Sequence, residues 1–273
     1  MTQPHHGYNR ELARFFSHRQ DCTTLRQDAH KLLLRAHNQG PQQQDYFIKI
    51  YQYPHFFHSR IKNRKFVGGG REYRVCIELK KRGIPTPVPV GFATDRTWMG
   101  VVKRSLYASR WLEDAQTLDA VIRHQHQHGH MDKQSWRHFI HDLGTFLGQI
   151  HLLLVNAQDL NTKNILVQKW PQTKPRFILV DYERIVFLKK YDLAKFINAL
   201  AQVGASLLPD FESDIRRLCE GYTRHVPHMD AKELRQKLIA ASWQKNRQWQ
   251  REIDDLFTTI DERLQGNEQA GRP

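Results

Sequence analysis

The chain has 273 residues, of which 40% are hydrophobic, 11% aromatic and 26% charged. These proportions are typical of a globular protein with a sizeable core, and they exclude disordered, fibrous and collagen-like classes. The 42 Lys and Arg residues outnumber the 28 Asp and Glu residues, which leaves a net charge of +14. Such a field favours polyanionic partners, namely nucleic acid, an anionic membrane face or phosphorylated substrates, without choosing among them.

Membrane-spanning and secretory segments are not expected. The most apolar stretch, residues 193–208, is interrupted by Lys195, Asn198 and Gln202, so no run of 18 uncharged apolar residues occurs. The N-terminal sequence has no continuous apolar segment of the kind found in signal peptides. We therefore expect a cytoplasmic chain.

The three cysteines, Cys22, Cys76 and Cys219, are far apart and lack any CxxC spacing. This arrangement predicts neither a disulfide framework nor a zinc cluster, in agreement with a reducing compartment.

Positive charge is concentrated between residues 60 and 82, where Glu72 and Glu78 are the acidic side chains. This segment attracts phosphate-rich ligands or forms a solvated basic surface, and the sequence leaves both interpretations open. Its basic residues are Arg60, Lys62, Arg64, Lys65, Arg71, Arg74, Lys80, Lys81 and Arg82.

The first half of the chain predicts a small β-rich unit. Residues 29–36 and 46–51 are β-favouring runs separated by the polar stretch HNQGPQQQD, which predicts two antiparallel strands. Residues 85–92, 98–102 and 105–107 predict further strands, because proline punctuates extended segments there.

A helix of about three turns is predicted between these strands, over residues 71–83. Glu72, Cys76 and Leu79 share one of its faces, basic residues crowd its last turn, and Gly83 ends it. We interpret the preceding triple glycine, residues 68–70, as a flexible segment leading into the helix.

The second half predicts mainly helices. Apolar residues recur at three- and four-residue steps from Asp132, a predicted N-cap, to Leu153, which predicts a long core helix. Residues 164–167 and 177–180 predict a β-hairpin, and amphipathic helices follow Asp192. We expect an α+β fold with a β-rich domain at 1–107, a mainly helical domain at 108–265 and a disordered tail at 266–273.

The histidine-rich stretch HQHQHGH covers residues 124–130. Its alternating histidines lack acidic or cysteine neighbours of the kind that complete a metal site, so we interpret it as a loop.

Two aspartates and an asparagine have a spacing that suits phosphoryl transfer. Asn164 follows Asp159 by five positions, and Asp181 follows Asp159 by 22, at the end of the predicted hairpin. In this arrangement a loop carboxylate accepts the proton of the attacking hydroxyl, while the amide and the second carboxylate hold Mg²⁺ against nucleotide phosphates.

The β-rich half supplies a candidate phosphate-binding cation. Lys49 lies in the apolar run FIKIY, where an ammonium needs an anionic partner to offset its desolvation. Glu72, on the apolar face of the predicted helix, is the expected partner. The alternative, in which Lys49 projects to water from an edge strand while Ile48 and Ile50 face inward, stays open from sequence alone.

The segments FIKIY, REYRVCIELKKRGIPTPVPVGF, QDLNTKNILV and FILVDYER together resemble the lipopolysaccharide core sugar kinases, the Kdo and heptose kinases of the protein-kinase-like superfamily. The resemblance runs from about Leu25 to Tyr222. It implies a two-lobed protein-kinase-like fold, ATP and Mg²⁺ as cofactors, and a sugar hydroxyl of the lipid A-linked inner core as acceptor.

The same resemblance implies roles for single residues. Lys49 binds the phosphates and Glu72 orients it, Asp159 is the catalytic base, and Asn164 and Asp181 are metal ligands. Peripheral contact with the anionic inner-membrane leaflet is a further expectation, because the acceptor is lipid-linked and the chain is basic.

The chain departs from protein kinases in several motifs. No GxGxxG occurs, so the phosphate cover is expected from the glycine-free connection at 27–30. Ala157-Gln158-Asp159 stands where protein kinases carry HRD, and Asp181-Tyr182-Glu183 replaces DFG. For Glu183 the sequence leaves two interpretations, a residue that assists metal binding and a solvated carboxylate, and we favour the second.

Three alternatives follow from these departures and from the charge. They are a small-molecule kinase of the aminoglycoside or choline type, a catalytically silent kinase-like binding module, and a nucleic-acid-binding protein. The retention of all five chemical positions argues against the silent module. We expect no nucleic-acid partner, because the six tryptophans are scattered and form no aromatic-basic cluster.

Overall fold

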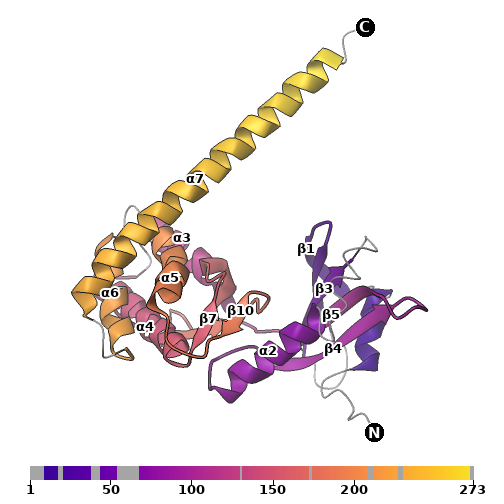
Figure 1. Cartoon of the computed structure of the whole chain (residues 1–273), viewed down its shortest axis with the longest axis horizontal. Helices are drawn as coiled ribbons and strands as arrows, with labels where there is room; N and C mark the ends of the chain where they lie inside the picture. Colours follow the sequence, from indigo (N-terminus) through magenta and orange to yellow (C-terminus); the bar gives the residue numbers. More distant parts are fainter. Residues whose placement is uncertain are drawn as a thin grey trace. The chain divides into compact units, whose positions relative to one another are not determined.

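The structure, a computed structural model, describes residues 9–17, 21–37, 44–53, 68–129, 131–171, 174–207, 212–226 and 230–270. The chain divides into two compact units (Figure 1). The first contains Met1–Gln116 and Ile165–Ile185, and the second contains Thr117–Asn164 and Val186–Pro273. The predicted hairpin near residue 170 therefore groups with the β-rich unit, although the sequence suggested one boundary at residue 107.

The first unit is built on a five-stranded antiparallel sheet with the order β1-β2-β3-β5-β4. The predicted pair of strands is present as β2 and β3, while β1 was not predicted from sequence. The predicted strand at 98–102 is wrong, because residues 97–100 form the turn between β4 and β5. The strands are β1 (Cys22–Gln27), β2 (Lys31–Ala36), β3 (Tyr46–Gln52), β4 (Pro89–Arg96) and β5 (Val102–Arg110).

Both faces of this sheet are covered around its central strand, β3. On one face, alternating apolar side chains such as Leu34, Ile48 and Ile50 pack with Leu12 and Phe15 of the short helix η1 (Arg10–Phe16). On the other face, helix α2 (Gly69–Lys81) packs against β3, β4 and β5. A polar side chain of β3 that points toward α2 is therefore buried as well.

The glycines before α2 contribute to packing, so their interpretation as a flexible segment is wrong. Gly69 and Gly70 are buried in the first turn of the helix. A Cβ atom on Gly69 would lie 2.1 Å from the carbonyl oxygen of Leu106, so only glycine allows the helix to approach β5 this closely. The close approach fixes the first turn of α2, which carries Glu72.

A smaller sheet completes the first unit. It has the order β6-β8-β9, and β8 and β9 form the antiparallel hairpin predicted from sequence. A backbone hydrogen bond of 3.0 Å from Leu179 to Pro85 joins β9 to the segment that follows α2. The strands are β6 (Ala115–Thr117), β8 (Ile165–Gln168) and β9 (Arg176–Leu179).

The second unit is mainly helical, as predicted. Asp132 caps α4 by accepting hydrogen bonds from the backbone of Gln134 and Ser135 at 2.8 and 3.0 Å. Helix α4 packs closely on α6, because Gly144 brings it against the backbone of Leu218. The helices are α3 (Leu118–His128), α4 (Lys133–Leu152), α5 (Leu193–Leu207), α6 (Glu212–Thr223) and α7 (Ala231–Ala270).

The histidine-rich stretch is not a loop through most of its length. Residues 124–128 form the last turns of α3, which ends at Gly129 in the left-handed conformation, and His130 lies outside the described residues. The helix forms because Thr117 caps it and Leu118, Val121 and Ile122 are buried, a signal that the histidines obscured in the sequence.

Three further short elements are associated with the connection that follows α4. Strands β7 (Val155–Ala157) and β10 (Ile185–Phe187) form a two-stranded sheet, and the short helix η2 (Thr162–Asn164) ends the connection.

The remaining sequence predictions have mixed outcomes. The three cysteines, all within the described residues, are not joined by disulfide bonds, and no helix of this part of the chain combines the length and apolar character needed to span a membrane. Helix α7 continues through residues 266–270, where a disordered tail was expected, and residues 271–273 lie outside the described part. Residues 60, 62, 64 and 65 of the basic segment and residues 38–43 of the predicted connection also lie outside it.

Candidate active site

Lys49 is buried in the middle of the five-stranded sheet. Its strand, β3, lies between β2 and β5, and its side chain is 6% exposed. Ile48 and Ile50 face the core on the η1 side, so Lys49 points to the α2 side. The alternative of a solvated edge-strand lysine is therefore wrong, because the strand is internal and both sheet faces are covered.

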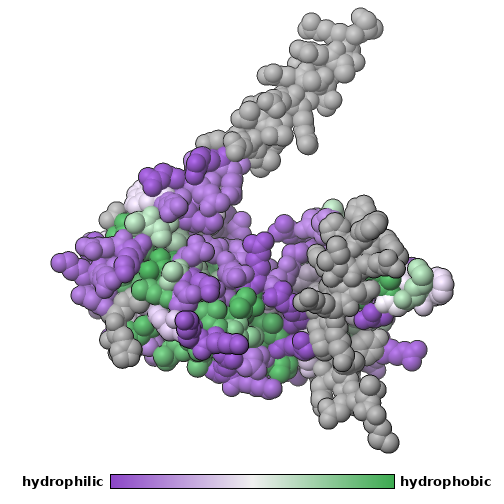
Figure 2. Space-filling model, in the orientation of Figure 1, coloured by the Kyte–Doolittle hydropathy of each residue, from purple (hydrophilic) through white to green (hydrophobic). Residues whose placement is uncertain are grey.

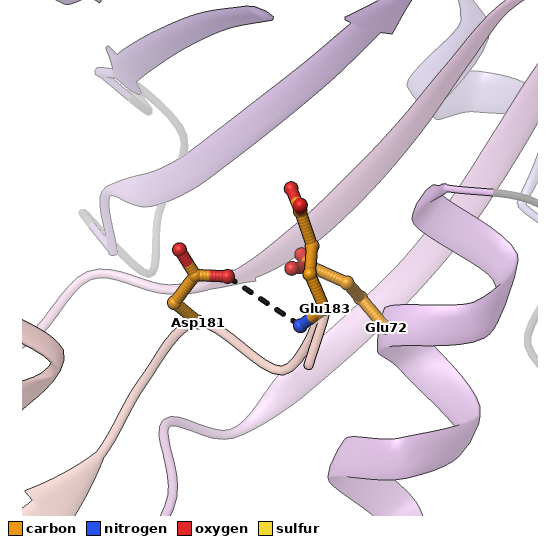
Figure 3. Close-up of side chains that lie close together, drawn as sticks. All are labelled: Glu72, Asp181 and Glu183. Atoms are coloured by element: carbon orange, nitrogen blue, oxygen red, sulfur yellow. Dashed lines mark hydrogen bonds between the residues drawn. The ribbon is translucent and has the colours of Figure 1, made fainter. Parts of the chain in front are cut away.

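Three carboxylates surround the Lys49 ammonium. It donates hydrogen bonds to Glu72 Oε1 at 2.9 Å and to Asp181 Oδ1 at 3.0 Å, and it lies 3.0 Å from Glu183 Oε1. Figure 3 shows the three carboxylates close together, with the backbone N–H of Glu183 donating to Asp181 Oδ1 at 3.4 Å. The predicted ion pair between Lys49 and Glu72 is thus present.

The backbone after β9 places two of these acids. Asp181 has a φ of 60°, a left-handed conformation that asparagine and aspartate tolerate better than most residues. The next residue, Tyr182, is fully buried, and its hydroxyl donates to the carbonyl of Leu179 at 3.2 Å. The buried tyrosine anchors the turn, so that Asp181 and Glu183 on either side both reach Lys49.

Burial and charge act in opposite directions on these groups. Burial lowers the pKa of Lys49, but the carboxylates of Glu72, Asp181 and Glu183 outweigh it and hold the pKa above its ordinary value. Burial raises the pKa of Glu72, and the nearby Asp181 adds to this increase. Burial also acts to raise the pKa of Glu183, but the two lysines Lys49 and Lys31 outweigh it and lower the value to about 2. The cluster is therefore stabilised by its own cations.

Lys31 is a site residue that sequence reasoning missed, and Glu183 is one for which it favoured the wrong interpretation. Glu183 is not a solvated carboxylate, because its side chain is 28% exposed and pairs with Lys31 at 2.8 Å as well as with Lys49. The register of β2 and β3 places Lys31 opposite Tyr51, two residues from Lys49 and on the same sheet face. A correct register would therefore have revealed Lys31.

The second predicted group lies in the connection between β7 and η2. The Asp159 carboxylate accepts a hydrogen bond from the Asn161 side-chain amide at 2.9 Å. The Asn164 side-chain amide donates to the Asp159 carbonyl oxygen at 2.9 Å, while the Asn161 side-chain oxygen accepts from the backbone of Asn164 at 3.2 Å. Asn161, which the sequence analysis did not single out, thus links the two predicted residues.

Buried contacts within the second unit hold the candidate catalytic loop, residues 158–164, in place. The Gln202 side chain of α5 donates to the carbonyl of Gln158 at 2.9 Å. The Thr162 hydroxyl lies 3.3 Å from both the Asp119 carboxylate and the Ser206 hydroxyl, and Leu160 is fully buried. Helices α3 and α5 therefore fix both ends of the loop and leave Asp159 and Asn164 partly exposed between them.

The available oxygen atoms suit a hard cation such as Mg²⁺. Oxygens of Glu72, Asp181 and Glu183 lie within 4.8 Å of one another, but in this arrangement all three acids contact Lys49. Asp181 is the most open of them, with a side chain that is 34% exposed. In Asn164 the amide nitrogen is engaged by Asp159, so its amide oxygen is the atom that suits a cation.

The structure thus places the five sequence-predicted residues in two groups. Lys49, Glu72 and Asp181 lie together in the first unit, and Asp159 and Asn164 lie together in the second. That the two groups act on one nucleotide stays a prediction.

Comparison with known proteins gives a consistent result. The model of the lipopolysaccharide kinase (Kdo/WaaP) family matches residues 34–222. A 3-deoxy-D-manno-octulosonic acid kinase of Pasteurella multocida (strain Pm70) is 29% identical over 113 residues, which cover 41% of this chain and 43% of that protein. One from Xylella fastidiosa (strain M23) is 25% identical over 174 residues, which cover 59% of this chain and 64% of that protein.

The solved structures include one described as WaaP in complex with acyl carrier protein. It matches with a TM-score of 0.62 and 17% identity, over 83% of this chain and 88% of that chain. At this level of identity the likeness shows the fold, and the predicted α+β class, with an antiparallel β-rich region followed by a helical region, is confirmed.

Proposed function

Because the chain belongs to the lipopolysaccharide kinase (Kdo/WaaP) family, we propose that it transfers the γ-phosphoryl group of ATP to a hydroxyl of an inner-core sugar, Kdo or heptose. The matched part of the chain spans less than half of the Pasteurella kinase, so the activity is argued from the site itself. The observation that carries the proposal is the buried Lys49 ammonium, held by a helix carboxylate and by the aspartate that follows a β-hairpin. Phosphoryl-transfer enzymes use this combination to hold nucleotide phosphates.

In this proposal Lys49 neutralises the α- and β-phosphates and Glu72 keeps it in place. An ammonium has three N–H donors, and all three carboxylates now surround it. An incoming phosphate therefore replaces one carboxylate. Of the three acids, Glu183 loses the least stabilisation when it leaves Lys49, because its carboxylate still pairs with Lys31 at 2.8 Å.

Asp159 takes the proton of the acceptor hydroxyl. The hydroxyl oxygen forms a bond to the γ-phosphorus, the bond from that phosphorus to the β-phosphate oxygen breaks, and ADP leaves. Asn161 orients the Asp159 carboxylate through its amide. Asn164 and Asp181 would hold Mg²⁺, which when bound would neutralise charge on the phosphates.

The partners follow from the proposed acceptor. A lipid A-linked saccharide lies at a membrane surface, so the protein works in the cytoplasm in contact with the inner leaflet. The net charge of +14 favours that anionic surface and the phosphorylated saccharide.

A labelling experiment tests the proposal. With Mg²⁺ and radiolabelled ATP, the protein is expected to label lipid A-core saccharide, and Asp159→Asn to slow labelling by about 10²–10⁴-fold while ATP binding persists. Asp142→Asn, the same change in helix α4, is the matched control and is expected to leave the rate unchanged.

The outcomes separate the alternatives. Labelling of an aminoglycoside or choline instead of the saccharide would favour a small-molecule kinase. ATP binding without labelling of any acceptor would favour the silent module, and full activity of Asp159→Asn would refute its assignment as the base.

A further inference from the structure

The turn between β4 and β5 presents two large apolar side chains to solvent. Trp98 is 93% exposed and Met99 is 55% exposed, which makes these neighbours the two most exposed large hydrophobic residues among the described side chains, which in helix α7 end at residue 253. On the face shown in Figure 2 hydrophilic residues predominate and apolar residues gather in separate patches. An indole left almost wholly in water is a feature that a binding partner would explain.

The exposure is imposed by an ordered turn. The backbone of Thr97 and Val101 pairs at 2.8 Å, and Gly100 donates to the carbonyl of Thr97 at 2.9 Å with a φ of 79°. The Arg96 guanidinium donates to the Gly100 carbonyl at 2.7 Å. The β4–β5 hairpin projects from the sheet in Figure 1, so the turn is a convex tip.

The tip is also basic. Beside the turn lie three basic residues, Arg96, Lys103 and Arg104, and one acidic residue, Asp95. Arg104 is paired with Asp95 at 2.7 Å, but Arg96 and Lys103 are exposed on either side of the turn and carry its positive charge.

We propose that this turn inserts Trp98 and Met99 into the headgroup region of an anionic phospholipid bilayer, with Arg96 and Lys103 binding lipid phosphates. An amphipathic ring flanked by basic side chains is the composition that favours the membrane interface. A protein partner is a poorer fit, since a stable interface buries about 800 Å² on each side and two convex side chains supply far less. The inference rests on the proposed function for its biological meaning, because a lipid-linked acceptor requires access to the bilayer.

Vesicle binding tests this surface directly and without ATP. The protein is expected to sediment with vesicles of phosphatidylglycerol and phosphatidylethanolamine and not with phosphatidylcholine alone. Trp98→Ala should weaken binding by at least about tenfold and Lys103→Glu by at least about fivefold. Brominated lipids should quench tryptophan emission in the native protein and not in Trp98→Ala.

Leu152→Ser is the matched control, because Leu152 is an exposed apolar residue of the second unit, and it should bind vesicles like the native protein. Unchanged thermal unfolding of Trp98→Ala confirms that the variant is folded. Vesicle binding by Trp98→Ala equal to that of the native protein would overturn the inference and leave a protein partner as the explanation.

An activity comparison separates this inference from the proposed function. Trp98→Ala is expected to keep its kcat/KM for an acyl-free core saccharide and to lose activity on the bilayer-embedded acceptor. Trp98-dependent vesicle binding by a protein that phosphorylates neither acceptor would refute the kinase proposal and support the membrane contact.

Discussion

In the first unit the Lys49 ammonium lies within 3.0 Å of three carboxylates, whereas in the second unit the Asp159 carboxylate accepts a hydrogen bond from the neutral amide of Asn161 at 2.9 Å. The first arrangement holds charged groups by their mutual attraction in a buried environment. The second fixes a carboxylate by amide hydrogen bonds on a loop anchored at both ends.

The two arrangements suit different tasks. In the Lys49 cluster each charge depends on its neighbours, so removing one leaves another buried and unpaired. In the catalytic loop the hydrogen bonds that set the geometry come mainly from amides, which do not titrate. These hydrogen bonds hold the Asp159 carboxylate in position, which the proposed role of a general base requires.

The largest expected effect comes from removing the central cation. Lys49→Met should lower the free energy of unfolding by about 3 kcal/mol, because Glu72 and its neighbours lose the charge that stabilises them. Asp159→Asn should change it by less than about 0.5 kcal/mol. Urea denaturation of the two variants measures the contrast.

Lys31→Met serves as the control, because it removes a cation at the rim of the same cluster. Lys31→Met should lower the free energy of unfolding by less than about 1 kcal/mol, as expected for a partly exposed ion pair. Equal losses for the two lysine variants would show that burial does not set the strength of the network.

The sequence predicts the parts of the fold that local signals determine. The core helix from Asp132, the hairpin near residue 170 and the strands around Lys49 were all correct, since hydrophobic periodicity and turn residues report them. Strand β1 was missed, because only one of its six residues is even partly buried and its apolar signal is weak.

The errors share a physical cause, which is that they depend on tertiary packing. In the sequence, the glycines before α2 indicated a flexible segment. In the structure, a Cβ atom at position 69 would lie 2.1 Å from the carbonyl oxygen of Leu106, so packing requires glycine there. Glu183 resembled a solvated acid because its two cations, Lys31 and Lys49, lie far away in the sequence. Long-range register is the information that a single sequence lacked.

Lowering the pH should destabilise the Lys49 cluster, because the Glu183 carboxylate becomes protonated. Its pKa is lowered from 4.5 to about 2 in the folded protein, so its contribution to stability is present above pH 4.5 and lost as the pH falls toward 2. Glu183→Gln should therefore cost about 2 kcal/mol at pH 7, allowing for solvent screening, and almost nothing near pH 2.

Unfolding free energies of the native protein and Glu183→Gln at several pH values measure this difference. Burial raises the pKa of Glu72, so this residue makes the opposite contribution to the pH dependence of stability. Both proteins contain Glu72, so its contribution largely cancels when their unfolding free energies are subtracted. A difference in unfolding free energy between the two proteins that stays constant from pH 7 to pH 2 would contradict the ion pairs assigned to Glu183.

A smaller effect than that of Lys49→Met is expected in the candidate catalytic loop, at the residue that links its two predicted functional groups. Asn161→Ala removes the amide that orients Asp159 and the side-chain oxygen that accepts from the backbone of Lys163 and Asn164. We expect kcat to fall roughly tenfold through loss of orientation, with the KM for ATP unchanged and stability lowered by about 1 kcal/mol. Lys163→Ala, an exposed change on the same loop, should leave kcat unaltered. If both variants keep full kcat, Asp159 does not depend on Asn161 for its position. The contrast drawn between the Lys49 cluster and a carboxylate held by amides would then be wrong for the loop.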